Sequence, residues 1–212
     1  GRIVFSDVFD RNIYNEDGYL LQLINENFPT DKGNVEELYE STDYSRDGQV
    51  VQLQKASSGT GIDLILLGDG FSDRQIADGS YEDLMELAMQ EYFEEEPYKT
   101  YKNLFNVYFV YAVSKNEGYH THGETCFSCR FDGTPQVSGK DSKVFAYALK
   151  AIEPERMDQS TIVVIMNSEE DAGTCFMYTP SIRGVDWSDG VTISYLPKGS
   201  GDENFGNTLH HE

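Results

Sequence analysis

One short apolar run constrains the fold of this chain more than any other feature. Residues 62–67, Ile-Asp-Leu-Ile-Leu-Leu, come after the hinge-like stretch Ser-Ser-Gly-Thr-Gly and are closed by Gly68-Asp69-Gly70. A run of this length between turns is typical of a strand buried on both faces in the centre of an α/β sheet. A tight turn at Gly68–Gly70 is favoured over a phosphate loop, because a third glycine and a Gly-Lys-Ser/Thr sequence are missing.

Helical and strand patterns alternate after this run. Apolar residues recur at helical spacing over residues 80–93 and 140–152. Residues rich in aromatic or β-branched side chains predict strands at 104–113, 161–166 and 191–196. This order predicts an α/β layer structure. The last of these strands alternates with period two, so we expect it at an open face or edge of the sheet.

The first 56 residues differ in character from the rest. They are polar and rich in turn-forming residues, and we interpret them as an irregular N-terminal segment or small lead-in to a domain over residues 57–212. Within the segment, residues 19–27 predict a short helix, and residues 50–54 predict a strand that pairs with a later segment of the chain. The Gly-rich loop over 115–138 is long for a connector, which favours a functional or covering role.

The charge of the chain excludes some partners. Lys and Arg number 16 against 37 Asp and Glu, a net charge of −21, which repels nucleic acid and anionic membrane surfaces. The sequence holds no run near the roughly 18 apolar residues of a membrane span. The acidity favours solubility, with calcium at clustered carboxylates as an alternative. The stretches 43–48 and 186–190 have suitable spacing without the full loop pattern, so capped turns are favoured there.

The cysteines leave three alternatives open. Cys126 and Cys129 lie near His120 and His122, and Cys175 stands apart. Thiolates and imidazoles can form a tetrahedral zinc site, although this spacing is crowded for one. A disulfide with one thiol left over, or free thiols, are the other possibilities. Nothing in the sequence predicts a base positioned for cysteine catalysis.

The pair His211-Glu212 fits the first two places of an H-E-x-x-H zinc helix. Histidines four residues apart project from one helical face and supply two of the three protein ligands of a catalytic zinc. The Glu after the first His reaches the zinc-activated water as general base. The second histidine would lie four positions after His211. A solvated helix end is the simpler reading of the pair alone, but a preceding strand and turn favour the zinc helix.

Several longer stretches carry a resemblance to a known family. Residues 62–71, 92–102, 105–118, 161–167 and 208–212 occur in the order found in that family. Over about residues 59–212 the chain resembles the bacterial IgA-peptidase-type metallopeptidases, family sixty-four of the metallopeptidase classification, which are zincin-like. The resemblance implies a zincin-like three-layer domain with a mixed central sheet, here lacking its C-terminal part. Cys126-Phe-Ser-Cys129 departs from the family's Asp- and Gly-rich loop.

The resemblance also implies a chemistry. His211 is expected to be the first zinc ligand and Glu212 the general base that hydrolyses peptide bonds of a protein or peptide substrate. The other ligands would come after Glu212, so the chain alone is expected to be inactive. Residues 191–196 are expected to hold the substrate as an extended strand. Secreted, periplasmic or cell-surface location is expected.

Two alternatives of other classes remain. The first is a non-catalytic surface protein that binds peptide or glycan with a peptidase-like domain. The second is a structural N-terminal module. Kinship of fold does not identify the substrate protein or the cleavage preference.

Overall fold

The fold is seen in a computed structural model of the chain. It describes residues 38–120, 122–131, 136–178, 181–182, 185–186, 190–199 and 201–212. The short helix expected over residues 19–27 lies outside these ranges. Contacts between Cα atoms group Leu38–Glu212 into one unit.

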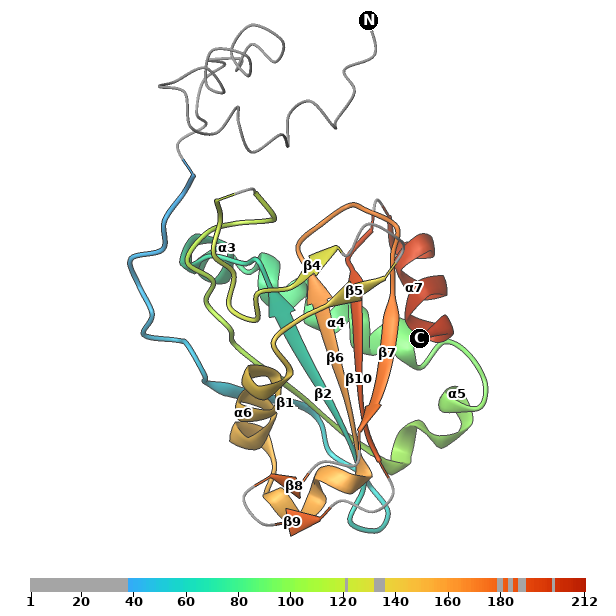
Figure 1. The fold of residues 1–212 in the computed structure, drawn as a ribbon. Coiled ribbons are helices and arrows are strands. Elements are labelled where there is room, and N and C mark those ends of the chain that lie inside the picture. The colour runs from blue at the N-terminus through green and yellow to red at the C-terminus, as the bar shows by residue number, and fades with distance from the viewer. Residues whose placement is uncertain are drawn as a thin grey trace, which may run out of the picture. The chain divides into compact units, whose positions relative to one another are not determined.

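A mixed sheet forms the centre of this unit (Figure 1). Its order over the described residues is β1-β3-β2-β6-β10-β7, in which the inner strands are parallel and both outer strands are antiparallel to their neighbours. The strands are β1 Val50–Gln54, β2 Ile62–Asp69, β3 Phe105–Val110, β6 Ser160–Met166, β7 Thr174–Tyr178 and β10 Val191–Pro197. The predicted α/β class with a mixed central sheet is therefore confirmed.

Helices and short hairpins complete the described fold. The helices are α3 Asp73–Ala77, α4 Ser80–Tyr92, α5 Tyr98–Tyr101, α6 Asp141–Ala151 and α7 Asp202–His211, with 3-10 turns at Lys102–Leu104 and Pro154–Gln159. The hairpins pair β4 Arg130–Phe131 with β5 Val137–Ser138, and β8 Ser181–Ile182 with β9 Val185–Asp186. None of the helices in the described part of the chain is long and apolar enough to cross a membrane.

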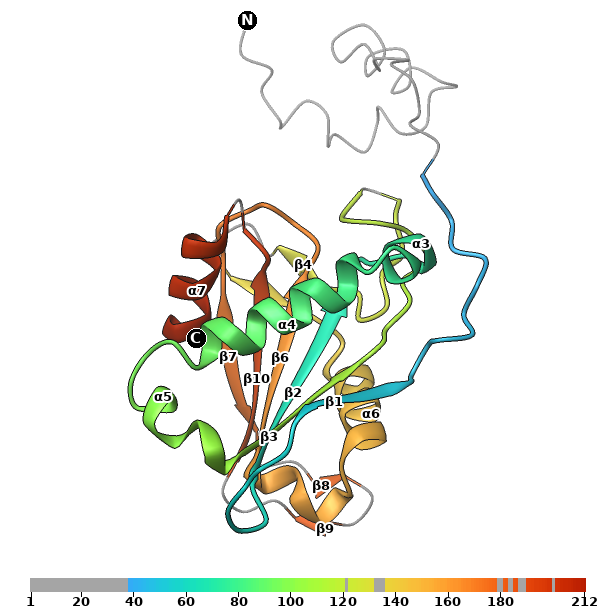
Figure 2. The same cartoon turned by 180° about the vertical axis from the view of Figure 1, so that it is seen from behind.

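Helices cover both faces of the sheet, giving three layers. Helices α4 and α7 lie on one face and α6 lies on the other, as Figures 1 and 2 show. Successive residues of a strand point to opposite faces. Leu64 and Leu66 accordingly join the apolar core under α4 and α7, whereas Ile65 and Leu67 join the core under α6. All four side chains are fully buried, so the expectation of a strand buried on both faces is confirmed.

The strand expected at the edge of the sheet is an interior strand. β10 pairs in parallel with β6 on one side and antiparallel with β7 on the other. Period-two alternation indicates that the two faces of a strand differ in polarity. It carries no information on whether the strand has a hydrogen-bonded neighbour on each side. Ser194 lies on the more polar face of β10 and is nevertheless buried, because α7 packs on β10. Among the described strands the edge position next to β10 belongs to β7, and the expectation for residues 191–196 was wrong.

The segment before the apolar run is fastened to the domain. β1, expected from the sequence, pairs with β3 through Val50 opposite Val110. Upstream of it, the Ser41 N–H donates to the Lys115 carbonyl at 2.8 Å, and the Gly48 N–H donates to the Tyr111 carbonyl at 2.8 Å. Residues 41–54 therefore run beside the strand and loop that include residues 105–115.

Candidate active site

Helix α7 carries the residues expected to bind zinc. Phe205 and Leu209, four residues apart, are 1% and 6% exposed and pack with the core under α4. Residues at this spacing lie on one face of a helix, and burying two such side chains contributes about 2 kcal/mol each. Gly206 allows close packing, because a Cβ there would lie 2.3 Å from a carboxylate oxygen of Glu91 on α4.

The two adjacent histidines have different surroundings. His210 Nε2 lies 2.8 Å from the Glu91 carbonyl oxygen, and its ring stacks on Tyr98 with centroids 6.5 Å apart. His211 is exposed. One residue on a helix turns the side chain by about 100°, so His210 faces α4 while His211 faces away from it. The sequence offered no means of telling these two histidines apart.

His211 and Glu212 line a hollow of 540 Å³, which we call the terminal hollow. Its walls come from α7, from the residues before β7 and from the residue before β5. The lining residues are Gln136, Asp171, Ala172, Gly173, Asn207, Thr208, His211 and Glu212. The structure thus brings both predicted site residues to one open hollow, together with Gly173 and Asn207, which the sequence did not single out.

The edge strand β7 begins at this hollow. Gly173 lines the hollow and the next residue, Thr174, starts the strand. Thr174 Oγ1 accepts a hydrogen bond of 3.0 Å from the Val137 N–H of β5, which ties the β4–β5 hairpin to the strand. Cys175 and Met177 are exposed, with Met177 76% exposed. Among the described strands β7 pairs with β10 alone, so its outer backbone groups face away from the sheet.

The cysteine-rich loop is held by a buried carboxylate that the sequence pattern did not reveal. Asp69, at the end of β2, is fully buried. Its carboxylate accepts hydrogen bonds from four donors: Tyr119 OH at 3.0 Å, Thr125 Oγ1 at 2.7 Å, Phe127 N at 2.6 Å and Cys129 N at 3.1 Å. A buried charge needs such partners. The signal in the sequence is an acid between two glycines after a buried strand, a pattern that by itself predicts only a turn.

All three cysteines lie within the described residues and are free thiols. Burial raises the pKa of Cys126 to about 12 and the pKa of Cys129 well above its usual range, so both stay protonated at neutral pH. No group of three His, Cys, Asp or Glu side chains suited to a metal occurs among the residues that the structure describes. Of the three alternatives for these cysteines, the structure has the free thiols.

The carboxylates of the first calcium candidate are bound to the protein. Asp43 Oδ1 accepts the Ser45 N–H at 2.8 Å, which caps a turn as expected. Asp47 accepts the Val113 N–H at 2.9 Å and the Tyr147 hydroxyl at 2.7 Å. In the second candidate, residues 187–189 lie outside the described residues.

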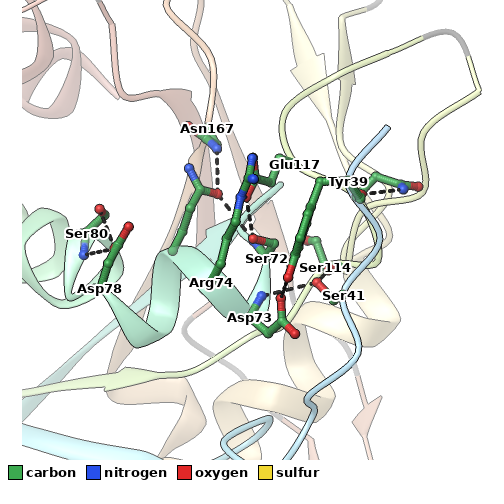
Figure 3. A network of polar contacts seen from close by, with 12 residues as sticks. Tyr39, Ser41, Ser72, Asp73, Arg74, Asp78, Ser80, Ser114, Glu117 and Asn167 are labelled. Carbon is green, nitrogen blue, oxygen red and sulfur yellow. Dashed lines mark hydrogen bonds and ion pairs between the residues drawn. The ribbon is translucent and has the colours of Figure 1, made fainter. Parts of the chain in front are cut away.

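A polar network around the start of α3 holds the N-terminal side of the domain (Figure 3). Asp73 accepts the Tyr39 hydroxyl at 2.7 Å and the backbone N–H groups of Thr42 and Asp43. Arg74 forms a two-pronged ion pair with Glu117 at 2.5 Å and lies over the Tyr39 ring. Desolvation raises the pKa of Asp73, but the hydrogen bonds outweigh it and lower that pKa to about 2.

Comparison with known proteins gives a family for part of this chain. The model of the family described as IgA Peptidase M64 matches residues 51–133, which include β1 from its second residue onward, β2, α4, β3 and the loop held by Asp69. No curated protein matches the chain. The matched range ends before α7, so the match does not extend to His211 and Glu212. Over residues 51–133 the chain is therefore similar to the IgA peptidase M64 family, in agreement with the resemblance seen in the sequence, and this match supports a protease that acts on peptides.

Proposed function

We propose that the protein is a zinc-dependent metallopeptidase, with His211 as the first zinc ligand and Glu212 as the general base. The family match supports the peptidase class. The observation that carries the finer assignment is the position of His211 and Glu212 together in the terminal hollow, at the start of the edge strand β7.

The donor chemistry of the terminal hollow suits zinc as far as the described residues extend. His211 offers an exposed imidazole, and Glu212 offers a carboxylate beside it. The described residues hold no complete set of three ligands. The family resemblance implies the second histidine four positions after His211, and the proposal takes the remaining ligands from residues beyond Glu212.

The chain's own residues divide the work of hydrolysis. Bound zinc supplies the Lewis-acid chemistry that makes water nucleophilic near neutral pH. The Glu212 carboxylate takes one proton from the attacking water and returns it to the leaving amine nitrogen. His210 is hydrogen-bonded to the Glu91 carbonyl and stacked on Tyr98. These contacts hold the end of α7 in place and so help to orient His211 and Glu212.

The substrate is proposed to bind along β7 rather than along β10. An extended peptide can add to an unpaired sheet edge through main-chain hydrogen bonds, with alternate side chains facing each side. β7 offers such an edge among the described strands, and it starts at the residue next to Gly173 in the terminal hollow. A peptide on this edge passes the general base.

The test uses the protein expressed from its complete gene. Zinc content is measured by elemental analysis, and cleavage is followed on a protein digest by mass spectrometry. We expect His211→Ala to lose zinc and cleavage, and Glu212→Gln to keep zinc while cleavage falls by about 100-fold or more. His122→Ala is the matched control, because His122 is an exposed histidine outside the terminal hollow, and it is expected to keep zinc.

Two results would count against the proposal. Equal cleavage by wild type and Glu212→Gln would remove Glu212 as the general base. Zinc-free protein that still binds peptides would favour the alternative of a non-catalytic binding protein. The proposal includes a location outside the cytoplasm, which the family resemblance supports and which cell fractionation tests.

A further inference from the structure

Met177 on the edge strand β7 is the most exposed large apolar side chain among the residues that the structure describes. It is 76% exposed, against 53% for Tyr101, the next in order. A single exposed apolar residue is common on protein surfaces, so only its position shows whether it has a binding role. Met177 lies on a strand that pairs with β10 alone among the described strands.

The Met177 side chain points to the face of the sheet on which α7 lies. Successive side chains of a strand alternate between the two faces. Phe176 and Tyr178 pack against the core under α6. Cys175 and Met177 therefore point to the opposite face, which carries α4 and α7 (Figures 1 and 2). Both are exposed there, because α7 packs on β10 and leaves these two side chains of β7 uncovered.

The strand links Met177 to the terminal hollow. Gly173 lines the hollow, and Met177 follows it by four residues, a distance of about 13 Å along an extended strand. Because Glu212 lies against Gly173, a peptide on this edge has its cleaved bond near the start of β7. Antiparallel pairing, the slightly more stable kind, runs the peptide from Met177 towards the hollow. The peptide residue opposite Met177 then comes three or four positions before the cleaved bond.

The Met177 side chain can adapt to different partners. Gly190, just before β10, has no side chain, and a Cβ built there would lie 3.2 Å from Met177 Cγ. The space beside the Met177 stem is therefore open because position 190 is a glycine. Methionine has three rotatable side-chain bonds and a polarizable sulfur, so it fits apolar groups of several shapes. This chemistry suits apolar partners as a class.

We propose that Met177 selects an apolar side chain three or four residues before the cleaved peptide bond of the substrate. The inference rests on the proposed peptidase function and on peptide addition to β7, and it adds the class of sequence that is cleaved. Directly opposite residues of neighbouring strands point to the same face, so one of these two substrate positions contacts Met177 and the other points to the α6 face. A charged side chain beside Met177 would lose water without gaining an ion pair.

The test uses the protein expressed from its complete gene and a peptide series built on a peptide that is cleaved in the protein digest. The third and fourth residues before the cleaved bond are varied in turn among Leu, Glu and Lys, and kcat/KM is measured for each peptide. We expect Leu to exceed Glu and Lys by about tenfold at one of the two positions, on the scale of burying one apolar side chain. At the other position the difference should stay below about twofold, because that side chain points away from Met177.

Met177→Glu is expected to exchange the preference. Its kcat/KM should fall about tenfold with Leu and rise about threefold with Lys, the scale of an exposed ion pair. Met177→Leu should keep the wild-type preference. Val50→Glu is the matched control, because it puts the same charge on an exposed apolar residue of β1, the other outer strand of the described sheet. It should leave the preference unchanged, and both exposed positions should accept glutamate without a change in melting temperature.

The outcomes separate this inference from the proposed function. Absence of cleavage would overturn the peptidase function and this inference with it. Cleavage at equal rates for Leu, Glu and Lys at both positions, or the wild-type preference in Met177→Glu, would overturn the inference alone. A wild-type dimer that Met177→Glu converts to a monomer in size-exclusion chromatography would show that β7 joins two copies of the chain, and would overturn the inference as well.

Discussion

The Glu212 carboxylate lies against the α-carbon of Gly173. A Cβ atom built on Gly173 would be 2.4 Å from Glu212 Oε1 and 2.8 Å from its Cγ, closer than real Cβ contacts. The backbone of Gly173 is not in the left-handed region, so alanine is conformationally allowed there. The absence of a side chain at position 173 thus leaves the space that the carboxylate of the proposed general base occupies.

Gly173→Ala is expected to move the Glu212 carboxylate without unfolding the protein. The clash involves the Glu212 side chain from Cγ to the carboxylate, which can rotate away, so the free energy of unfolding should change by less than about 1 kcal/mol. A misplaced catalytic group can cost about 100-fold in rate, so kcat should fall by about 10- to 100-fold.

Thermal unfolding and a cleavage assay measure the two effects of Gly173→Ala. Gly201→Ala is the matched control, because a Cβ at that position meets nothing within 4 Å. Wild-type kcat in Gly173→Ala would show that the position of the Glu212 carboxylate does not limit the reaction.

The adjacent histidines should separate stability from zinc binding. His210→Ala removes the hydrogen bond to the Glu91 carbonyl and the stacking on Tyr98, so it should lower the free energy of unfolding by about 1 kcal/mol. His211→Ala removes an exposed side chain and should change that free energy by less than about 0.5 kcal/mol. Urea denaturation of both variants measures the difference. Equal destabilisation would contradict the assignment of His210 to the packing of α7.

Asp73 should make stability depend on pH in the acid range. Its pKa is about 2 in the folded protein against 3.8 for a free side chain, because hydrogen bonds from Tyr39, Thr42 and Asp43 outweigh desolvation. The folded pKa is lowered, so this stabilisation is present above about pH 4 and is lost as pH falls towards 2.

The variant Asp73→Ala tests this dependence. It should be less stable than wild type at pH 7 by about 2 kcal/mol, the scale of hydrogen bonds to a charged group. Its stability should also vary less than that of wild type between pH 4 and pH 2. Urea midpoints across this range give the comparison, and parallel curves for the two proteins would exclude the predicted contribution.

The three cysteines should differ in reactivity. Cys175 on β7 is exposed, whereas Cys126 and Cys129 are 4% and 6% exposed and have raised pKa values because of burial. A thiol reagent such as Ellman's reagent should label one thiol quickly in the native protein and three in urea.

The variant Asp69→Asn tests the role of the buried carboxylate. It puts an amide NH₂ group next to the N–H and hydroxyl groups that donate to Asp69, which should destabilise the loop by about 3 kcal/mol. Labelling of the two buried thiols should then accelerate, and an unchanged rate would mean that Asp69 does not hold the loop.

Local patterns predicted the helices and strands whose own apolar residues mark the face that is buried in a core. The helix expected over 80–93 is α4, Ser80–Tyr92, and the helix expected over 140–152 is α6, Asp141–Ala151. The strand expected over 161–166 lies within β6. These elements need only one apolar face or run to be recognised, and that information is local to the sequence. The prediction of an edge position for residues 191–196 was wrong because the neighbours of a strand are set by contacts between residues that are distant in the sequence.

The candidate site shows the same division. The pair His211-Glu212 and its likeness to a zinc helix are visible in the sequence. The roles of His211 as zinc ligand and of Glu212 as general base stay predictions. Nothing local distinguishes His210 from His211, because only the packing of α7 on α4 determines which ring meets the Glu91 carbonyl.

The sequence by itself determined the α/β class, the buried strand at 62–67 and the family resemblance, because each depends on residue type and local spacing. Tertiary structure alone decided that β7 is an outer strand of the described sheet, that Asp69 holds a loop about 50 to 60 residues further along the chain, and that Gly173 adjoins Glu212. Those relationships join segments far apart in the chain. Their partners are chosen by the burial of polar groups and by the packing of helices on the sheet, which no local pattern records.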